Sequence, residues 1–176
     1  MTTSTAYLLL IGLTALERLA ELVVSRRNAA WSFARGGIEV GTGHFPYMVV
    51  LHTLFLVACP VEVLLLNRGF TPWLGGTMVL VCVGTQALRW WCITSLGRRW
   101  NTRVIIIPGM PPVQAGPYRF MKHPNYAAVV LEGLALPLVH NAWWTAIGFT
   151  VLNAWMLKTR IACENAALER LVEQPQ

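Results

Sequence analysis

The stretch GPYRFMKHPNY, residues 116–126, is a short basic and aromatic hinge between long apolar segments. Pro117 and Pro124 each lack a backbone donor and bias the residue before them away from helix. The hydrogen-bonding side chains in and beside the hinge are Tyr118, Arg119, Lys122, His123 and Tyr126. Because this set leads directly into an apolar segment, we expect the hinge to hold a small polar ligand.

The composition indicates a membrane protein. Apolar residues make up 55% of the 176 residues and charged residues only 12%. Soluble domains carry roughly a quarter charged residues. The length fits one domain, residues 1–176. We therefore predict a single all-α integral membrane domain.

The apolar segments set the expected number of helices. Four are long enough to consider as membrane spans: 7–24, 47–66, 73–96 and 126–158. The last exceeds the roughly 20 residues that cross a bilayer, so Pro137 and the His140-Asn141 pair should divide it. We predict five transmembrane helices, at about 6–24, 47–66, 73–96, 125–140 and 142–164, with the fourth short.

Two connections are expected to lie on the side of the hinge. Residues 25–46 should form a loop, with Trp31 and Phe33 in the headgroup layer. The β-branched run at 104–107 is too short to span a bilayer and is closed by Pro108-Gly109. We predict that this run is extended and lies against the protein.

The basic residues predict the orientation. Of the 14 Lys and Arg residues, one, Arg68, lies in the short 67–72 connection, and two, Arg18 and Arg89, lie inside predicted helices. The others are Arg26, Arg27, Arg35, Arg98, Arg99, Arg103, Arg119, Lys122, Lys158, Arg160 and Arg170. By the positive-inside rule, the N-terminus is outside and the C-terminus is cytoplasmic, in an inner membrane.

The net charge of +6 then reflects topology and attraction to anionic lipid headgroups. A nucleic-acid surface would need basic residues interleaved with exposed aromatics, which the sequence does not offer, so we expect no nucleic-acid partner. Cys59, Cys82, Cys92 and Cys163 lack metal-type spacing and are interpreted as buried free thiols. No metal site is expected.

Charged groups inside the predicted spans form the second candidate site. A charge at the centre of a membrane helix costs about 2.5–3.5 kcal/mol, so Glu17, Arg18 and Glu21 must face protein or water. An internal ion pair that fixes helix packing, or snorkelling near the cytoplasmic end, is the favoured interpretation, and a direct substrate role is the alternative. Arg89 lies deeper than the other basic residues of its helix end. His52 is more typical of a hydrogen-bonded packing element than of a ligand.

The final helix carries a polar stripe that can face the hinge. Asn153, Arg160 and Glu164 are spaced seven and four residues apart, which places them on one side of a helix. They could serve a polar cofactor, or Arg160 and Glu164 could form a surface pair worth a few tenths of a kcal/mol. The sequence pattern alone leaves both interpretations open.

The side chains exclude several reaction types. The chain has no Asp, no Ser-His-Asp or Cys-His set, and no paired carboxylates in a loop. Its polar groups gather at one predicted membrane face instead. This placement suits a reaction between a water-soluble cofactor and a lipid substrate.

The hinge resembles a known signature. Gly116-Pro117-Tyr118-Arg119 followed by Lys122-His123-Pro124-Asn125-Tyr126 is similar to the G-P-Y-R…R-H-P-x-Y motif of the isoprenylcysteine carboxyl methyltransferase family, which belongs with the membrane phospholipid methyltransferases. The family's second signature is a Glu pair after the last membrane helix. Here Glu164 is followed by Asn165, so this chain carries one of the two charges of that signature. This match covers roughly the C-terminal half.

The N-terminal half resembles a narrower branch, the small bacterial enzymes encoded beside type III polyketide synthases. The resemblance lies in Glu17-Arg18 and Glu21, Ser25-Arg26-Arg27-Asn28, Glu39-Val40-Gly41, His44 to Tyr47, 96–103 and 153–157. Those enzymes are understood to O-methylate alkylpyrone or alkylresorcinol lipids. The resemblance therefore implies a lipid acceptor and a functional link to a type III polyketide synthase.

The resemblance also implies a cofactor, S-adenosylmethionine, in a cytoplasmic pocket formed by the C-terminal helices and the 97–125 connection. His123, Tyr126 and Tyr118 would line it, Glu164 would bind ribose hydroxyls, and Arg119 or Lys122 would hold the methionine carboxylate. Asn153 and Arg160 would complete the cofactor side, under a lid at 104–118. Glu21, Arg89 and His52 would serve the acceptor, whose tail would enter sideways between helices.

Three alternatives stay open. The acceptor could be the carboxylate of a prenylated cysteine, which is ionised without help. A membrane reductase that uses NADPH carries a similar His-Pro-x-Tyr element, but a chain of 176 residues offers few contacts for a second nucleotide. A membrane scaffold without catalysis is the third.

Overall fold

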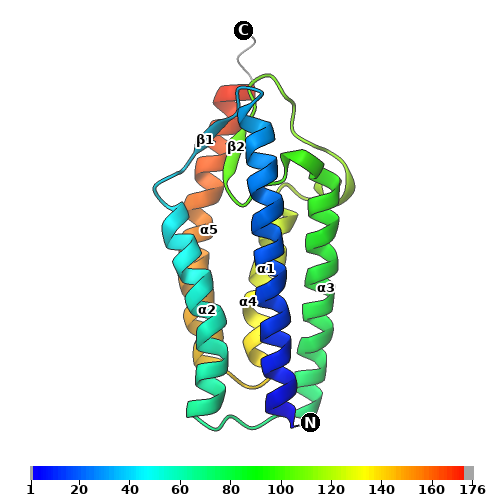
Figure 1. The fold of residues 1–176 in the computed structure, drawn as a ribbon, viewed down its shortest axis with the longest axis vertical. Helices are drawn as coiled ribbons and strands as arrows, with labels where there is room; N and C mark the ends of the chain where they lie inside the picture. Colours follow the sequence, from blue (N-terminus) through cyan, green and yellow to red (C-terminus); the bar gives the residue numbers. More distant parts are fainter. Residues whose placement is uncertain (1, 173–176) are drawn as a thin grey trace.

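The computed structural model describes residues 2–172 and shows a bundle of five α-helices with its two termini at opposite ends (Figure 1). Residues 1 and 173–176, which the predicted domain includes, lie outside the described part, as does the side chain of Arg170. In chain order the elements are α1 (Thr3–Phe33), β1 (Ile38–Val40), α2 (Phe45–Leu65), α3 (Pro72–Leu96), the 3-10 helix η1 (Gly97–Arg99), β2 (Val104–Ile106), the 3-10 helix η2 (Gly116–Arg119), α4 (Pro124–Leu138) and α5 (Trp143–Val172).

Prolines and one left-handed residue set several helix boundaries. Pro72 and Pro124 occupy the first positions of α3 and α4, where a missing backbone donor costs nothing. The predicted break of the long final apolar segment is confirmed, because α4 ends at Leu138 and Asn141 takes a φ of +58° in the turn before α5. α4 is also short, as predicted, with 15 residues.

Two predicted boundaries were wrong. α1 does not stop at residue 24 but continues to Phe33, so Trp31 lies on a helix rather than in a 25–46 loop. The helix can continue because no Gly or Pro occurs there before Gly36. Ser25 and Asn28 are buried, and their side chains form hydrogen bonds with the connection after α3. α5 likewise runs past residue 164 to Val172.

A two-stranded antiparallel sheet covers the end of the bundle that holds the C-terminus. Ile38 pairs with Ile106, and Val40 pairs with Val104. The prediction of an extended segment at 104–107 is confirmed for β2, but its partner strand lies in a region predicted as loop. Val104 and Ile106 pack against Ala167 of α5, so the sheet ties α5 to the 97–107 connection.

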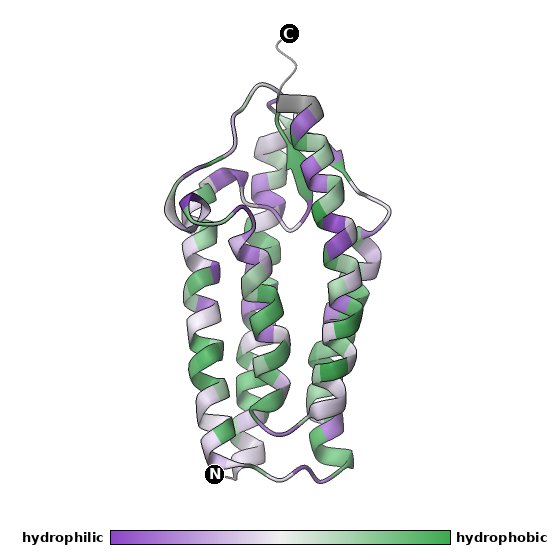
Figure 2. Ribbon diagram, turned by 180° about the vertical axis from the view of Figure 1, so that it is seen from behind, coloured by the Kyte–Doolittle hydropathy of each residue, from purple (hydrophilic) through white to green (hydrophobic). Residues whose placement is uncertain are grey.

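Hydrophobic residues predominate along the helices, and hydrophilic residues are more frequent toward the C-terminal end of the bundle (Figure 2). Within residues 2–172, two helices are long and apolar enough to cross a membrane, Phe45–Leu65 and Pro72–Arg99. Only 22% and 28% of their most apolar windows are buried, whereas the core helix of a soluble protein is mostly buried. Large apolar side chains therefore face outward, as they do in lipid.

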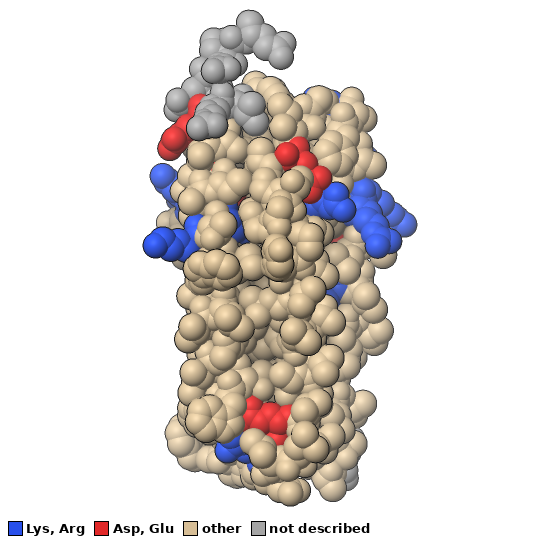
Figure 3. Space-filling model, turned by 90° about the vertical axis from the view of Figure 1, so that its left-hand side faces the viewer, with Lys and Arg blue, Asp and Glu red and all other residues tan. Residues whose placement is uncertain are grey.

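Lys and Arg side chains gather near the C-terminal end of the bundle, and a smaller charged group lies near the other end (Figure 3). This distribution agrees with the one read from the sequence. The membrane orientation inferred from it stays a prediction.

The core fills the half of the bundle away from the sheet. Phe55, Cys59 and Leu136 are buried there with Phe149. Gly133 lies against the Phe149 ring, so a Cβ at this position would collide with it. Cys59, Cys82 and Cys92 are buried free thiols, as predicted, and Cys163 is a half-buried free thiol.

Glu62 fixes the start of α5 at this far end. Its carboxylate accepts hydrogen bonds from the backbone N–H of Trp144 at 3.2 Å, from the N–H of Thr145 at 2.7 Å and from the Thr145 hydroxyl at 2.8 Å. Arg68 donates to it at 2.8 Å. Glu62 of α2 thus caps the start of α5, the third α-helix after its own in the chain.

We expect Glu62→Ala to lower the free energy of unfolding by about 2 kcal/mol or more, because it leaves helix-start donors and a guanidinium without an acceptor. The midpoint of thermal unfolding in detergent measures this loss. Glu39→Ala is the matched control: it removes a carboxylate whose partner, Arg103, is 46% exposed. The control should cost under about 1 kcal/mol, and an equal loss in both variants would contradict the capping role.

Candidate functional site

A cavity of about 740 Å³ opens at the C-terminal end of the bundle. Its walls come from the 96–107 connection, the segment 110–126 and the last part of α5. The lining residues include Trp100, Asn101, Tyr118, Arg119, Lys122, His123, Asn125, Tyr126, Arg160, Glu164 and Asn165. This volume lies within the range of small-molecule sites.

The hinge is bent by local conformation. Gly116 has a φ of +56°, and a Cβ there would collide with the hydroxyl of Ser95, so the turn needs glycine. His123 stands just before α4, and its carbonyl accepts from the backbone N–H of Tyr126 and of Ala127. The hinge therefore delivers His123 and Tyr126 together to the cavity wall.

The Tyr126 hydroxyl joins two charged groups of α5. It donates to Glu164 Oε2 at 2.5 Å and accepts from Arg160 Nε at 2.8 Å. Arg160 is 6% exposed, and its Nη2 donates to the carbonyl of Thr102 at 2.6 Å. The interpretation of Arg160 and Glu164 as a mere surface pair is therefore wrong, because a buried guanidinium and the carboxylate meet through a tyrosine of another helix.

His123 adds an aromatic face to this network. Its ring stacks on the Tyr126 ring, with centroids 5.3 Å apart and planes 21° apart. The Nε2–H donates to Asn165 Oδ1 at 3.3 Å, and Nδ1 lies 3.9 Å from Glu164 Oε2. Asn165, which replaces the second Glu of the family signature, thus holds the histidine ring.

The remaining predicted cofactor residues divide into two groups. Tyr118, Arg119 and Lys122 line the cavity with the network just described. Burial, and to a smaller extent the nearby Cys92, raise the pKa of the Tyr118 phenol, so it stays a neutral hydrogen-bonding group. Asn153 lies about two turns from Arg160 on α5, is 2% exposed and is not among the lining residues.

The cavity has a charge pattern suited to a zwitterionic ligand. Arg99, Arg103, Arg119, Lys122 and Arg160 supply positive charge on its walls, and Glu164 and Glu169 supply carboxylates. Buried polar atoms without a hydrogen-bond partner also line it: Trp100 Nε1, Asn101 Oδ1 and Asn125 Oδ1. Such atoms are costly to leave unpaired, so they are available to a polar ligand.

A second set of polar side chains lies deeper, between α1, α3 and α4, and we call it the inner polar cluster. Its members are Glu17, Arg18, Glu21, Gln86, Arg89 and Glu132. Arg89 donates to Glu132 at 2.5 Å, and Arg18 donates to Glu21 at 3.0 Å and to Gln86 at 2.9 Å. The prediction of an internal ion pair in α1 is confirmed.

Glu132 is central to this cluster but was not predicted as a site residue. The signal was a lone carboxylate inside the 126–158 apolar segment, where a charge needs a partner. The predicted acceptor residues Glu21 and Arg89 are brought together here, with 3.7 Å between Arg89 Nε and Glu21 Oε1. His52 instead donates through Nδ1 to the Met48 carbonyl and meets the Phe149 ring edge-on, which is a packing arrangement.

Two comparisons with known proteins bear on the chain. The model of the isoprenylcysteine carboxyl methyltransferase (ICMT) family matches residues 78–170, which include the hinge, α4 and the Tyr126–Glu164 network. A curated relative, "Uncharacterized protein YpbQ" of Bacillus subtilis (strain 168), is 41% identical over 161 residues. The match covers 92% of this chain and 95% of the relative.

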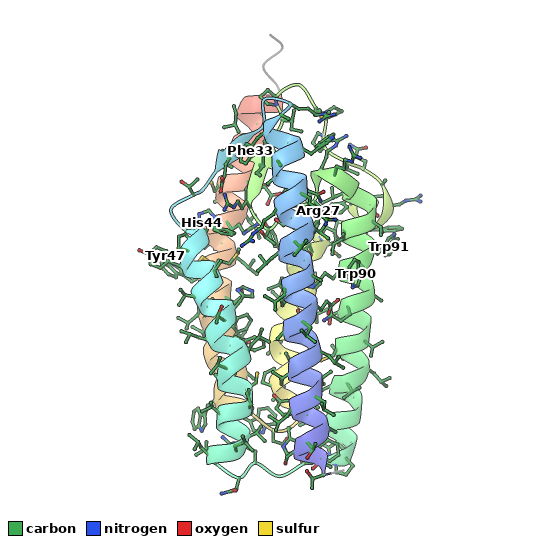
Figure 4. All side chains as sticks on the ribbon, viewed as in Figure 1. Arg27, Phe33, His44, Tyr47, Trp90 and Trp91 are labelled. Atoms are coloured by element: carbon green, nitrogen blue, oxygen red, sulfur yellow. The ribbon has the colours of Figure 1, made fainter. Side chains whose placement is uncertain are left out.

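The pKa of His44, which Figure 4 labels, depends on the charge of Arg160. Burial lowers the pKa of His44, and the Arg160 guanidinium lowers it further, because both disfavour the imidazolium. We expect Arg160→Gln to raise the pKa of His44 toward its ordinary value of about 6.5. An NMR titration of the histidine resonances measures the shift. Arg35→Gln, which removes an exposed guanidinium held over Trp31, should leave it unchanged; the same pKa in all three proteins would contradict the assignment.

Proposed function

The chain belongs to the isoprenylcysteine carboxyl methyltransferase family, a family of membrane methyltransferases, and from this premise we propose that it transfers a methyl group from S-adenosylmethionine to an oxygen of a lipid acceptor. The preferred acceptor is the hydroxyl of a type III polyketide lipid, an alkylpyrone or an alkylresorcinol. The carboxylate of a prenylated cysteine is the second candidate, and the family's own name favours it.

The single observation that carries the proposal is the network at Tyr126. Glu164 and Arg160 of α5 meet the Tyr126 hydroxyl of α4 beside the stacked His123 ring. These groups stand at the end of an apolar bundle, where a soluble donor and a lipid acceptor can meet.

The lining residues fit the donor. Glu164 accepts hydrogen bonds from ribose hydroxyls, and the stacked His123 and Tyr126 rings present an aromatic surface to the adenine. Arg119 or Lys122 holds the methionine carboxylate. The unpaired Asn101 and Asn125 oxygens accept from amino groups of the ligand.

The bound donor supplies an electrophilic methyl group on a sulfonium, which needs no further activation. The protein therefore acts mainly by positioning the acceptor oxygen. An ordinary phenol has a pKa near 10, so a hydroxyl acceptor gains from a carboxylate that takes its proton and a guanidinium that stabilises its oxygen. We assign these roles to Glu21 and Arg89, which meet in the inner polar cluster with 3.7 Å between Glu21 Oε1 and Arg89 Nε.

The proposed reaction also requires a particular orientation of the protein in the membrane. The pocket faces the cytoplasm, the 104–118 segment closes over the donor, and the acceptor enters sideways between helices of the inner membrane. A type III polyketide synthase is the proposed source of the acceptor. A reporter fused to each terminus tests the orientation, because the two ends lie on opposite sides of the bundle.

We expect the purified protein in detergent to bind S-adenosylhomocysteine, the product of the donor, and to show no comparable affinity for NADPH. Isothermal titration calorimetry measures both ligands with one preparation. Binding of NADPH alone would support the reductase alternative. Binding of neither would support a scaffold.

Two substitutions test the site assignment. Glu164→Ala and His123→Ala should each weaken binding of S-adenosylhomocysteine by roughly tenfold or more. Glu164→Ala removes a hydrogen bond to a charged group, and His123→Ala removes a stacked ring. Methyl transfer from radiolabelled donor should fall in parallel. Lys158→Ala is the matched control, since Lys158 is an exposed charged residue of α5, between one and two turns before Glu164. Unchanged affinity and transfer in both site variants would remove the assignment.

A further inference from the structure

The hinge has an outer side as well as the side that lines the cavity. Four consecutive exposed residues form this outer side: Arg119, Phe120, Met121 and Lys122. The residues directly before and after them, Tyr118 and His123, are half-buried and line the cavity. The backbone N–H groups of Phe120 and Met121 both donate to the Pro117 carbonyl, so the segment is a tight turn. A contact that holds the outer side in place therefore also holds the two cavity-lining side chains.

The tip of the hinge lies at the level of a membrane interface. Trp73 and Trp91 are exposed near the two ends of α3 and lie roughly 27 Å apart along the helix. This distance is close to the hydrocarbon thickness of about 30 Å, and exposed tryptophans mark membrane interfaces. The Phe120 ring is 6.4 Å from that of Trp91, which Figure 4 labels on the outer side of α3. Phe120 itself is 72% exposed, so its ring is available to lipid.

Two cations flank this apolar tip. Within the described part of the chain, none of the ion pairs includes Arg119 or Lys122. The Arg119 guanidinium lies over the Phe120 ring, 5.2 Å from its centroid. Long basic side chains at an interface keep their charged ends among the headgroups while their stems cover apolar surface. The outer side of the hinge thus offers apolar side chains to an acyl chain and positive charge to a phosphate.

The charge around the cavity favours an anionic headgroup over a zwitterionic one. Five basic side chains line the cavity, against the carboxylates of Glu164 and Glu169. The proposed donor carries a sulfonium and an ammonium beside its carboxylate, so it adds positive charge to this surplus. A lipid phosphate beside Arg119 and Lys122, at the rim, would reduce the repulsion, and a zwitterionic headgroup would do so less. Anionic lipids are present in the cytoplasmic leaflet, which the proposed orientation places at this end.

We propose that residues 119–122, which we call the hinge surface, bind the phosphate and the upper acyl chain of an anionic phospholipid, and that the bound lipid tightens donor binding in the adjoining cavity. This lipid is a ligand that holds the hinge and is not a methyl acceptor. The lipid site depends only on the hinge surface, whereas its effect on the donor rests on the proposed function. Free phosphate would meet the same cations but would leave Phe120 and Met121 without a partner.

Two phospholipids with identical acyl chains test the lipid site. Phosphatidylglycerol and phosphatidylcholine are titrated onto the delipidated protein in detergent, and native mass spectrometry gives the affinity of the first lipid bound. We expect phosphatidylglycerol to bind more tightly by roughly fivefold or more. Excess inorganic phosphate should not displace it. Equal affinities would overturn the proposal, and displacement by phosphate would replace the lipid site with a site for free anions.

Substitutions locate the lipid site. The double variant Arg119→Gln with Lys122→Gln should weaken phosphatidylglycerol binding by roughly tenfold or more, because it removes both cations at the headgroup. The matched control is Arg26→Gln with Arg27→Gln, which removes two adjacent exposed cations of α1 toward the same end of the bundle. The control should leave the affinity nearly unchanged. An equal loss in both double variants would show general attraction by surface charge and would overturn the proposal.

The effect on the donor is tested in lipid nanodiscs. Isothermal titration calorimetry measures the affinity for S-adenosylhomocysteine in discs of phosphatidylcholine alone and in discs that also contain phosphatidylglycerol. We expect phosphatidylglycerol to tighten binding by roughly fivefold or more. Phe120→Ser should abolish this gain but keep the affinity in phosphatidylcholine, since Phe120 is not among the cavity-lining residues. Phe33→Ser, at another exposed phenylalanine of the same end, should keep the gain.

The outcomes separate this proposal from the proposed function. Equal affinity of the wild-type protein in the two discs, or a full gain in Phe120→Ser, would overturn the effect on the donor. Retained affinity of Phe120→Ser in phosphatidylcholine shows that the variant is folded. If the wild-type protein binds S-adenosylhomocysteine in neither disc, the methyltransferase assignment fails and takes the effect on the donor with it. The lipid affinities measured in detergent then decide the hinge surface without any donor.

Discussion

A charge buried in an apolar bundle must be paired, and this requirement organises the protein. The carboxylates of Glu21 and Glu132 and the guanidinium of Arg89 lie on three different helices, so pairing them fixes how α1, α3 and α4 lie together. Arg160 and Glu164 impose the same requirement at the C-terminal end, where the Tyr126 hydroxyl satisfies both. The apolar side chains fill the space between helices, and the charges determine which faces meet.

The sequence allowed the hinge and its partners to be predicted because their signals are local. Prolines at 117 and 124 mark the bend, and the spacing of Arg160 and Glu164 requires one helix face. The pairing of β1 with β2 could not be predicted, since it joins segments over 60 residues apart and each strand has three residues. The extension of α1 to Phe33 also depends on distant contacts, because the Thr102 hydroxyl and the Trp100 carbonyl pair the buried Ser25 and Asn28.

Asn165 and Glu132 show why a site is harder to predict than a fold. The family signature has a carboxylate at position 165, where this chain has Asn165. The structure shows that the Asn165 side chain is hydrogen-bonded to His123. No residue near Glu132 in the sequence indicates its role, because its partners lie on α1 and α3. In both cases the function of the residue is set by its tertiary partners rather than by its local pattern.

The shortness of α4 affects the membrane itself. Its 15 residues rise only about 22 Å, several ångströms less than the hydrocarbon layer of about 30 Å. In the membrane arrangement proposed above, a helix this short would leave the polar hinge before Pro124 below the lipid phosphates, and the bilayer would thin or admit water around it. Such a thinned region would bring an aqueous reactant down to a lipid, so that an amphiphile could react without leaving its leaflet.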